Sequence, residues 1–160
     1  MKTAILYASK HGTTEKVAAS IAEKLRDANE VELFSLKQHP HPDISGFERV
    51  IIGSSVYAGR AAKEMKTFCK TNESVLLQKK TGLFVCGMYP TRAEQEKELK
   101  EAYSEVLLKN AAATGFLGGE FLFEKMNFFE RLIARMIAKT KTSVHRIHWK
   151  AIVGFVGKLQ

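Results

Sequence analysis

The sequence is poor in the residues that mark disulfide-rich, proline-rich and membrane-spanning proteins. Its 160 residues include two cysteines, three prolines and one tryptophan. Cys69 and Cys86 form neither a C-x-x-C motif nor the spacing of a metal site, so we expect two buried free thiols and a reducing, cytoplasmic setting. No apolar run reaches the roughly 18 residues that span a membrane, and the chain begins directly with a predicted strand, so we expect no signal peptide.

Repeats, low-complexity segments and linkers are also lacking. A chain of 160 residues without linkers predicts a single domain over 1–160 with one sizeable core. His39 and His41 alternate with prolines, but two histidines are too few ligands for a typical site, so we predict no metal.

Acidic residues are outnumbered, and the basic surplus is unevenly placed. The formal net charge is +8. From Glu124 to the C-terminus, eight Lys and Arg face two Glu, a net charge of +6 that leaves +2 for the first 123 residues. Such a surplus favours an anionic partner, either a membrane surface, an acidic protein or a carboxylate-bearing substrate, and we predict no nucleic-acid partner. The alternative is a solvated face that only aids solubility.

Short apolar runs predict five strands. The runs at 4–8, 50–53 and 83–86 do not alternate, which is typical of strands covered on both faces of a parallel sheet. The run at 31–36 alternates more and predicts an edge strand. The run at 116–123 predicts a fifth strand, in which Gly118 and Gly119 indicate a bulge or a close backbone approach.

Amphipathic stretches separate these runs. Apolar residues at helical spacing predict a helix from near Thr14 to Leu25, further helices around 62–69 and 99–107, and a closing helix around 147–156. The alternation of strand and helix predicts an α/β fold, a doubly wound five-stranded parallel sheet with helices on both faces. Ligands of such a sheet bind at the carboxyl ends of its strands.

The loop after the first strand has the composition of an anion site. It consists of Ser9, Lys10, His11, Gly12, Thr13 and Thr14. A strand-to-helix turn points backbone N–H groups and the positive end of a helix dipole at one spot, and hydroxyls add further donors. The loop has one glycine and matches neither G-x-G-x-x-G nor the P-loop, which favours a monophosphate. The alternative is an ordinary turn with Thr13 or Thr14 as the N-cap.

Two further loops end at the same predicted edge of the sheet. They comprise Ser54, Ser55, Val56, Tyr57, Ala58 and Gly59 after the third strand, and Gly87, Met88 and Tyr89 after the fourth. Their small residues allow close approach of a ligand, and their tyrosines are stacking surfaces. Together with the first loop, they predict a site for a flat aromatic ring system with a phosphate tail.

The three loops carry a resemblance to the flavodoxins. The first is similar to that family's phosphate loop, Thr/Ser-x-Thr-Gly-x-Thr: Ser9, Gly12 and Thr14 match, and His11 stands where the family usually has a hydroxyl residue. The second and third are similar to the family's two flavin loops. The resemblance implies non-covalently bound FMN, contacts to it from all three loops, and the strand order 2-1-3-4-5.

The segment 124–142 distinguishes the chain from ordinary flavodoxins, which are acidic electron carriers. It is similar in pattern and position to the basic insertion of the menaquinone-dependent protoporphyrinogen IX dehydrogenases, a branch of that family. Met126, Phe129, Ile133, Met136 and Ile137 fall on one helical face. This pattern fits a helix packed on the sheet and also a basic helix on anionic lipid. Trp149 likewise fits either the core or an interfacial anchor.

The resemblance to this branch implies an FMN-dependent oxidoreductase that converts protoporphyrinogen IX to protoporphyrin IX with a quinone as acceptor. It would be cytoplasmic, with peripheral contact at the inner face of the cell membrane. Arg92, Arg131 and Arg135 are the expected anchors for the propionates. No side chain stands out as a general base. The alternatives are an electron carrier that docks on an acidic redox partner, an NAD(P)H-dependent quinone reductase, and a binding module without FMN.

Overall fold

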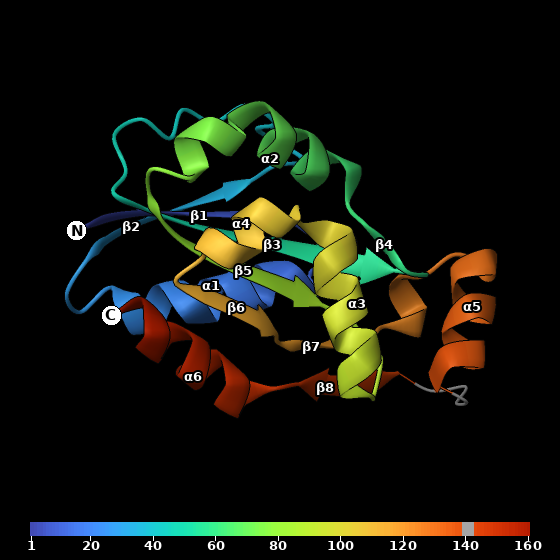
Figure 1. Ribbon diagram of the computed structural model, residues 1–160. Coiled ribbons are helices and arrows are strands. Elements are labelled where there is room, and N and C mark those ends of the chain that lie inside the picture. Colours follow the sequence, from blue (N-terminus) through green and yellow to red (C-terminus); the bar gives the residue numbers. More distant parts are fainter. Residues whose placement is uncertain (139–142) are drawn as a thin grey trace.

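The computed structural model describes residues 1–138 and 143–160, and a parallel sheet forms its centre (Figure 1). Five strands pair in parallel in the order β2-β1-β3-β5-β6. They are β1 (Lys2–Ala8), β2 (Glu30–Ser35), β3 (Arg49–Tyr57), β5 (Lys80–Cys86) and β6 (Ala113–Phe116). The predicted fold class, the order of the parallel strands and the edge position of β2 are confirmed. A short extra strand, β4 (Arg60–Ala61), pairs antiparallel with β3 and was not predicted.

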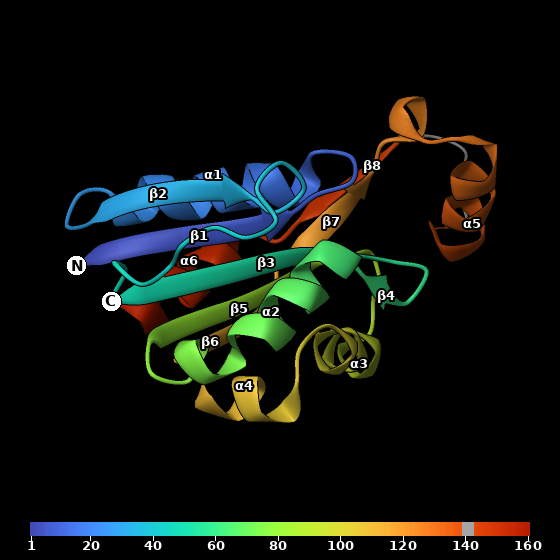
Figure 2. The ribbon, with the colours of Figure 1, turned by 90° about the horizontal axis from the view of Figure 1, so that it is seen from above.

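Helices cover both faces of the sheet, as predicted (Figures 1 and 2). One face carries α1 (Thr13–Leu25) and α6 (Trp149–Leu159). The other carries α2 (Lys63–Leu76), α3 (Arg92–Ala102) and α4 (Glu105–Asn110). Because side chains alternate along a strand, neighbouring residues enter different cores: Leu6 packs on the α2 side and Ile5 on the α1 side.

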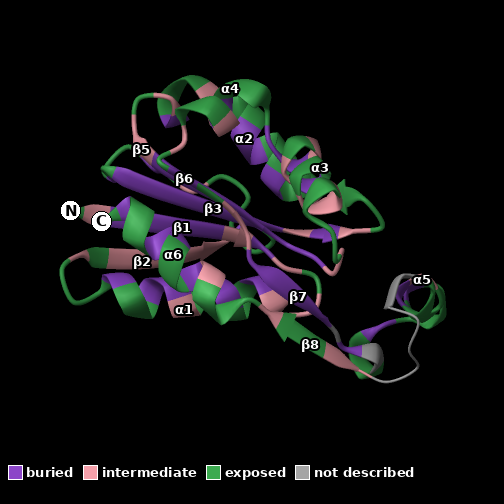
Figure 3. Cartoon of the chain, turned by 60° about the horizontal axis from the view of Figure 1, so that its bottom comes forward, coloured by how far each residue is buried: buried purple, intermediate pink, exposed green. Residues whose placement is uncertain are grey.

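The strands are buried between the two helical layers, which expose their outer surfaces (Figure 3). This double coverage explains the unalternating apolar runs that predicted the central strands. Both cysteines are buried free thiols, as expected, Cys69 in one core and Cys86 in the other.

The predicted helix around 99–107 is wrong, because it is two helices. α3 ends at Ala102, and the backbone of its C-cap residue Tyr103 is extended (φ −126°, ψ 147°). The Ser104 hydroxyl then caps α4 by accepting from the Leu107 N–H at 3.3 Å. The buried Tyr103 hydroxyl lies 2.8 Å from the Ile52 carbonyl and 2.7 Å from the Phe84 carbonyl. The hydrogen bonding of the Tyr103 hydroxyl to strand carbonyls and the Ser104 cap both stabilise the break, so two helices are favoured over one continuous helix.

The predicted fifth strand at 116–123 is also wrong, because the chain leaves the sheet after Phe116. β7 (Gly118–Phe121) pairs antiparallel with β8 (Val144–Ile147) in a separate two-stranded sheet. Gly118 has φ +80°, and a Cβ there would collide with the Arg146 carbonyl oxygen. The glycine pair therefore permits the predicted close backbone approach, and it also makes the turn that separates β6 from β7.

The segment 124–142 belongs to the connection from β7 to β8, and its helix α5 (Phe128–Ala138) lies apart from the central sheet (Figure 2). The single-turn helix η1 (Phe123–Lys125) begins one residue before the segment, and residues 139–142 lie outside the described residues. The expectation of a helix packed on the sheet is wrong: Phe129 and Met136, both on the predicted inner face, are 73% and 72% exposed. Trp149, at 53% exposure, is not a core residue. Within the described ranges, no helix is long and apolar enough to cross a membrane.

Candidate functional site

A pocket lies at the carboxyl ends of β1, β3 and β5, where the three predicted loops meet. Most of the predicted cofactor residues line it: Ser9, Lys10, His11, Thr13, Thr14, Ser55, Val56, Tyr57, Ala58, Gly87, Met88 and Tyr89. Gly12, Ser54 and Gly59 are the predicted residues that do not. The structure thus brings together residues that are about 80 positions apart in the sequence, because parallel strands end at one edge.

The first loop ends at the start of α1, which has the features of an anion site. Gly12, with φ +93°, is the N-cap of α1, so the expectation of a threonine N-cap is wrong. The first hydrogen bond within the helix runs from the Lys16 N–H to the Gly12 carbonyl at 3.0 Å, which leaves the N–H groups of the first turn without intrahelical acceptors. Ser9 Oγ accepts from the Gly12 N–H at 3.0 Å and tightens the loop. The helix dipole and these N–H groups together favour a phosphate.

A hydroxyl in this loop is buried without a conventional partner. Thr14 is fully buried, and its Oγ1 has no hydrogen bond within the described parts of the chain, although it lies beside the Cys86 thiol. Burial raises the pKa of Cys86 to about 12, so this thiol stays protonated and is a weak acceptor. A phosphate in the pocket would give the Thr14 hydroxyl a strong acceptor.

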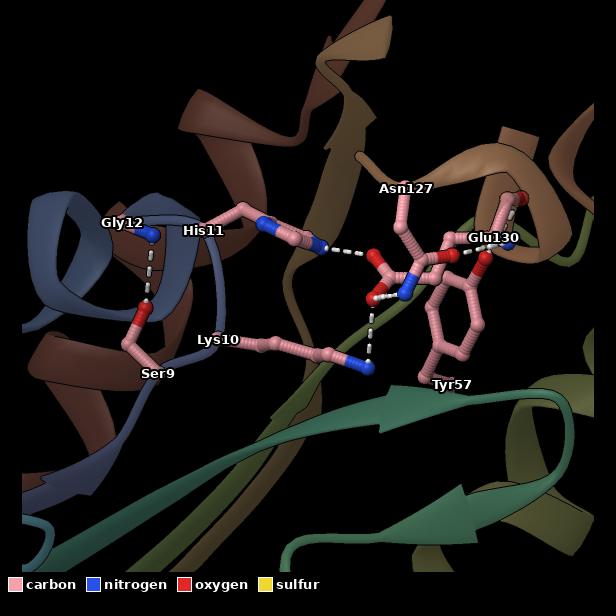
Figure 4. A network of polar contacts seen from close by, with 7 residues as sticks. All are labelled: Ser9, Lys10, His11, Gly12, Tyr57, Asn127 and Glu130. Carbon is pink, nitrogen blue, oxygen red and sulfur yellow. Dashed lines mark hydrogen bonds and ion pairs between the residues drawn. The ribbon is translucent and has the colours of Figure 1, made fainter. Parts of the chain in front are cut away.

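Glu130 of α5 connects the segment 124–142 to the first two loops (Figure 4). Its carboxylate lies 3.0 Å from Lys10 Nζ and 2.5 Å from His11 Nε2, and Asn127 holds it through a side-chain bond at 3.0 Å. Tyr57 donates its hydroxyl proton to the Glu130 carbonyl at 2.6 Å. Burial opposes ionisation of Glu130, but the hydrogen bonds from Lys10 and His11 hold its pKa below the usual range. An anionic clamp thus joins α5 to the phosphate loop.

The second loop is a tight turn between β3 and β4. Ala58 and Gly59 both have positive φ, +49° and +73°, as in a two-residue hairpin of type I′. Ser54 is structural, because its Oγ donates to the Ser55 carbonyl at 2.9 Å and accepts from the Ala62 N–H at 3.1 Å. The turn leaves the ring of Tyr57 at the pocket, with Lys10 Nζ 5.0 Å from the ring centroid. Burial, reinforced by Glu130, raises the pKa of Tyr57 to about 12.

The backbone of the third loop packs against β7. The Gly87 N–H donates to the Gly118 carbonyl at 3.0 Å, and a Cβ on Gly119 would lie 2.6 Å from the Gly87 oxygen. From the other side, the Gln95 side-chain amide of α3 donates to the Tyr89 carbonyl at 3.0 Å. These contacts hold the backbone of the third loop between β7 and α3.

Two buried acids that sequence reasoning missed also line the pocket. Glu120 pairs with Lys16 at 2.7 Å and with His145 at 2.8 Å. Burial opposes its ionisation, yet hydrogen bonds from these two residues keep the pKa of Glu120 below the usual range. Glu98 of α3 is different: neither carboxyl oxygen has a hydrogen bond among the described residues. Burial, and then repulsion from Glu94 and Glu101, raises its pKa to about 8.

A signal for Glu98 was present in the sequence. It lies four residues before Ala102, so both face the core from one side of α3. An acid on the inner face of an amphipathic helix is uncommon unless it is paired or functional. Glu120 and Glu130 carry no such local signal, because their partners come from distant parts of the chain.

The three predicted substrate-binding arginines do not line the pocket. Arg92 begins α3, its side chain is 92% exposed, and it pairs with Glu96 one turn later. Arg131 and Arg135 are exposed on α5. Arg131 follows Glu130 directly on α5, Arg135 lies one turn further along the same helix, and Arg92 begins α3 after the third loop.

Comparison with known proteins assigns the family. A family model described as a flavodoxin domain matches residues 4–147. The chain belongs to the flavodoxin family. Over 171 aligned positions, this flavodoxin-family chain is also 19% identical to the protoporphyrinogen IX dehydrogenase [quinone] of Escherichia coli K12, with 99% of this chain and 94% of that protein covered.

Solved flavodoxins share the fold of this family member. Flavodoxin 1 of Bacillus cereus is similar at 22% identity with a TM-score of 0.58, covering 74% of this chain and 83% of that one. A Streptococcus pneumoniae TIGR4 flavodoxin has 20% identity and a TM-score of 0.58, covering 99% and 97%. The Fusobacterium nucleatum flavodoxin solved with flavin mononucleotide has 20% identity and a TM-score of 0.50, covering 71% and 68%.

Proposed function

We propose that this chain is an FMN-dependent oxidoreductase that dehydrogenates protoporphyrinogen IX and passes the electrons to a quinone. The observation that carries the proposal is the pocket itself, in which an anion-binding helix start opens toward two loops with tyrosines. The full-length similarity to the Escherichia coli dehydrogenase supports the choice of substrate and acceptor.

The residues of the pocket fit FMN. The first-turn N–H groups of α1, with the hydroxyls of Ser9, Thr13 and Thr14, would hold the phosphate, and the buried Thr14 hydroxyl would gain the acceptor that it lacks. Tyr57 and Tyr89 would flank the ring from the second and third loops. FMN, when bound, supplies the acceptor for hydride equivalents and transfers the electrons onward.

The surface around α5 fits the proposed substrate and acceptor. Arg131 and Arg135 would pair with the propionates, because guanidinium groups bind carboxylates in a bidentate manner, and Arg92 would do so from the start of α3. Phe128, Phe129, Leu132 and Met136 are exposed apolar side chains of the same helix. We propose that they contact an anionic membrane at the cytoplasmic side, where a quinone dissolved in lipid would be within reach.

The second candidate is an electron carrier without a substrate of its own. It is favoured by the flavodoxin fold and by the basic C-terminal quarter, which would dock on an acidic redox partner. A third, an NAD(P)H-dependent quinone reductase, would reveal itself by oxidation of nicotinamide.

An anaerobic assay distinguishes these functions. Purified protein reconstituted with FMN is mixed with protoporphyrinogen IX and a soluble menaquinone analogue, and porphyrin fluorescence is followed. We expect turnover that depends on both FMN and the quinone. We also expect the double variant Arg131→Ala/Arg135→Ala to raise KM for the porphyrinogen about tenfold or more, as loss of charged hydrogen bonds would. The matched control is Lys24→Ala/Arg26→Ala at the far end of α1.

Two results would contradict the proposal. A flavin-loaded protein without turnover would favour the electron carrier. An unchanged KM in the double variant of α5 would remove Arg131 and Arg135 from the substrate site.

A further inference from the structure

Glu98 is a buried acid that faces the pocket without a partner. The residue is 3% exposed, and both of its carboxyl oxygens are inaccessible and without a hydrogen bond in the described parts of the chain. Nearly all buried polar groups in folded proteins are hydrogen-bonded, since leaving one unpaired costs about 1–3 kcal/mol. Glu98 lines the pocket, and Gly87 of the third loop lies over its carboxyl group, so a ligand that shifts this loop slightly can supply the missing partner.

The other unpartnered buried polar groups form a separate set. Thr3, Arg49 and Thr81 lie near the amino ends of β1, β3 and β5, at the edge of the sheet opposite the pocket. Of the unpartnered groups in the described chain, only Thr14 and Glu98 line the pocket. The phosphate of the cofactor would be the hydrogen-bond partner of Thr14. The partner of Glu98 would then be another part of the same ligand.

The backbone around Glu98 keeps its carboxyl at the third loop. A Cβ on Gly87 would lie 2.5 Å from Glu98 Oε2, so the absence of a side chain at position 87 makes room for the acid. A capping box between Thr91 and Glu94 fixes the start of α3, with Thr91 Oγ1 accepting from the Glu94 N–H at 3.3 Å. Glu98 is therefore held by α3 against Gly87 of the third loop, which is expected to contact the ring of the cofactor.

The charges around Glu98 favour its protonated form. Glu94 and Glu101 approach it from its own helix, and both disfavour a further negative charge. Across the pocket, Glu130 contacts Lys10 and His11, and Glu120 from β7 pairs with Lys16. Cys86 of β5 carries a thiol whose pKa is raised to about 12 by burial, so it brings no charge. Glu98 is thus a neutral acid at pH 7, with one O–H to donate.

We propose that the Glu98 carboxyl binds the ring system of the cofactor directly, donating its proton in a hydrogen bond to a carbonyl oxygen or imine nitrogen of the ring. This inference rests on the proposed FMN site. Two-electron reduction places more negative charge on such acceptor atoms. A donor aimed at them therefore binds the reduced ring more tightly than the oxidised ring and raises its reduction potential.

Two substitutions separate the donor from the shape of the side chain. Glu98→Gln keeps a donor and cannot ionise, whereas Glu98→Leu removes the donor at similar volume. The matched controls are Glu23→Gln and Glu23→Leu, at an exposed position in the last turns of α1, remote from the phosphate loop. Circular dichroism of each variant verifies folding, the dissociation constant of FMN is measured by fluorescence quenching, and the midpoint potential is measured against a reference dye.

We expect Glu98→Leu to bind FMN about tenfold more weakly and to have a lower midpoint potential, about 30 mV for each tenfold difference between the two redox states. Glu98→Gln is expected to stay within about threefold of the wild type. Because the wild type loses its donor when the acid ionises, its FMN affinity should fall above about pH 8, and that of Glu98→Gln should not.

The inference is overturned if Glu98→Leu keeps the affinity and potential of the wild type, or if the wild type and Glu98→Gln share one pH profile. The pH profile needs only the wild type and Glu98→Gln, so it decides the matter even if Glu98→Leu does not fold. A wild type that takes up no FMN would instead overturn the proposed function, and the inference with it.

Discussion

At the scale of single residues, a side chain placed for ligand binding lowers the stability of the folded protein. Glu98 is the clearest case, since burial without a partner makes its charged form costly in the folded chain. Its pKa is raised from 4.5 in the unfolded reference to about 8. Below pH 4.5 both states hold the proton. Between about pH 4.5 and 8 the unfolded state releases it and the folded state retains it, so stability falls as pH rises.

Because the wild type loses stability as pH rises, its stability should differ from that of Glu98→Gln in a pH-dependent way. Glu98→Gln should be more stable than the wild type by a margin that grows from pH 5 to pH 8, reaching on the order of 2–4 kcal/mol. Urea denaturation of the cofactor-free proteins at both pH values measures the margin, and the exposed Glu23→Gln serves as the control. A margin that is equal at pH 5 and pH 8 would show that Glu98 titrates alike in the folded and unfolded states.

At the scale of elements, the small β7–β8 sheet supports the cofactor site. β7 touches the third loop through backbone alone, at Gly118 and Gly119, and it carries Glu120 into the pocket. The chain between the two strands brings Glu130 to the phosphate loop. The chain from β7 to α5 therefore contacts all three loops.

Gly119→Ala tests this support. The added methyl would lie 2.6 Å from the Gly87 oxygen, which is backbone and cannot rotate away. We expect a loss of stability of about 1–3 kcal/mol, as in other overpacked sites, together with weaker FMN binding because the third loop is displaced.

The matched control is Gly157→Ala in α6, where the new Cβ meets nothing within 4 Å. There we expect a gain of about 0.5–1 kcal/mol and unchanged FMN binding. Thermal unfolding and FMN titration measure both effects, and unaltered FMN binding in Gly119→Ala would contradict the supporting role of β7.

At the scale of the whole molecule, exposed apolar surface and two exposed arginines, Arg131 and Arg135, lie together on α5. The residues from Glu124 onward carry a net charge of +6 out of +8. On α5, Phe128 is 75% exposed, Phe129 73% and Met136 72%. The helix projects beyond the carboxyl end of the sheet, on the side where the pocket lies (Figure 2). A surface bound through α5 would therefore lie near the cofactor site.

Vesicle binding tests this surface. The protein should sediment with vesicles that contain anionic lipid and not with neutral ones, and binding should weaken as salt rises. Phe128→Asp/Phe129→Asp should reduce binding about tenfold or more, because it removes buried apolar area and adds negative charge. The control Val106→Asp/Val153→Asp changes valines that are 52% and 57% exposed elsewhere. Equal loss in both double variants would show that α5 has no special role, and binding to an acidic redox protein in place of vesicles would favour the electron carrier.

The resemblance to the flavodoxins implied the order of the parallel strands, and the sequence by itself determined the central strands, the two helical layers and the position of the three loops. These features depend on local periodicity and on turn residues such as Gly12, which act over a few positions. The sequence also indicated the close approach at Gly118 and Gly119, although the extent of the strand around them was wrong.

Only the tertiary structure decided where α3 and β6 end and which groups the buried acids contact. The helix break at Tyr103 depends on the Ile52 and Phe84 carbonyls, and the exit of the chain after Phe116 depends on β8, about 30 residues later. Glu130 binds His11 across 119 positions, and Glu98 is left without a partner by every described element around it. Whether a buried acid is paired, neutral or open to a ligand depends on which groups distant segments bring to it, and no local pattern encodes that arrangement.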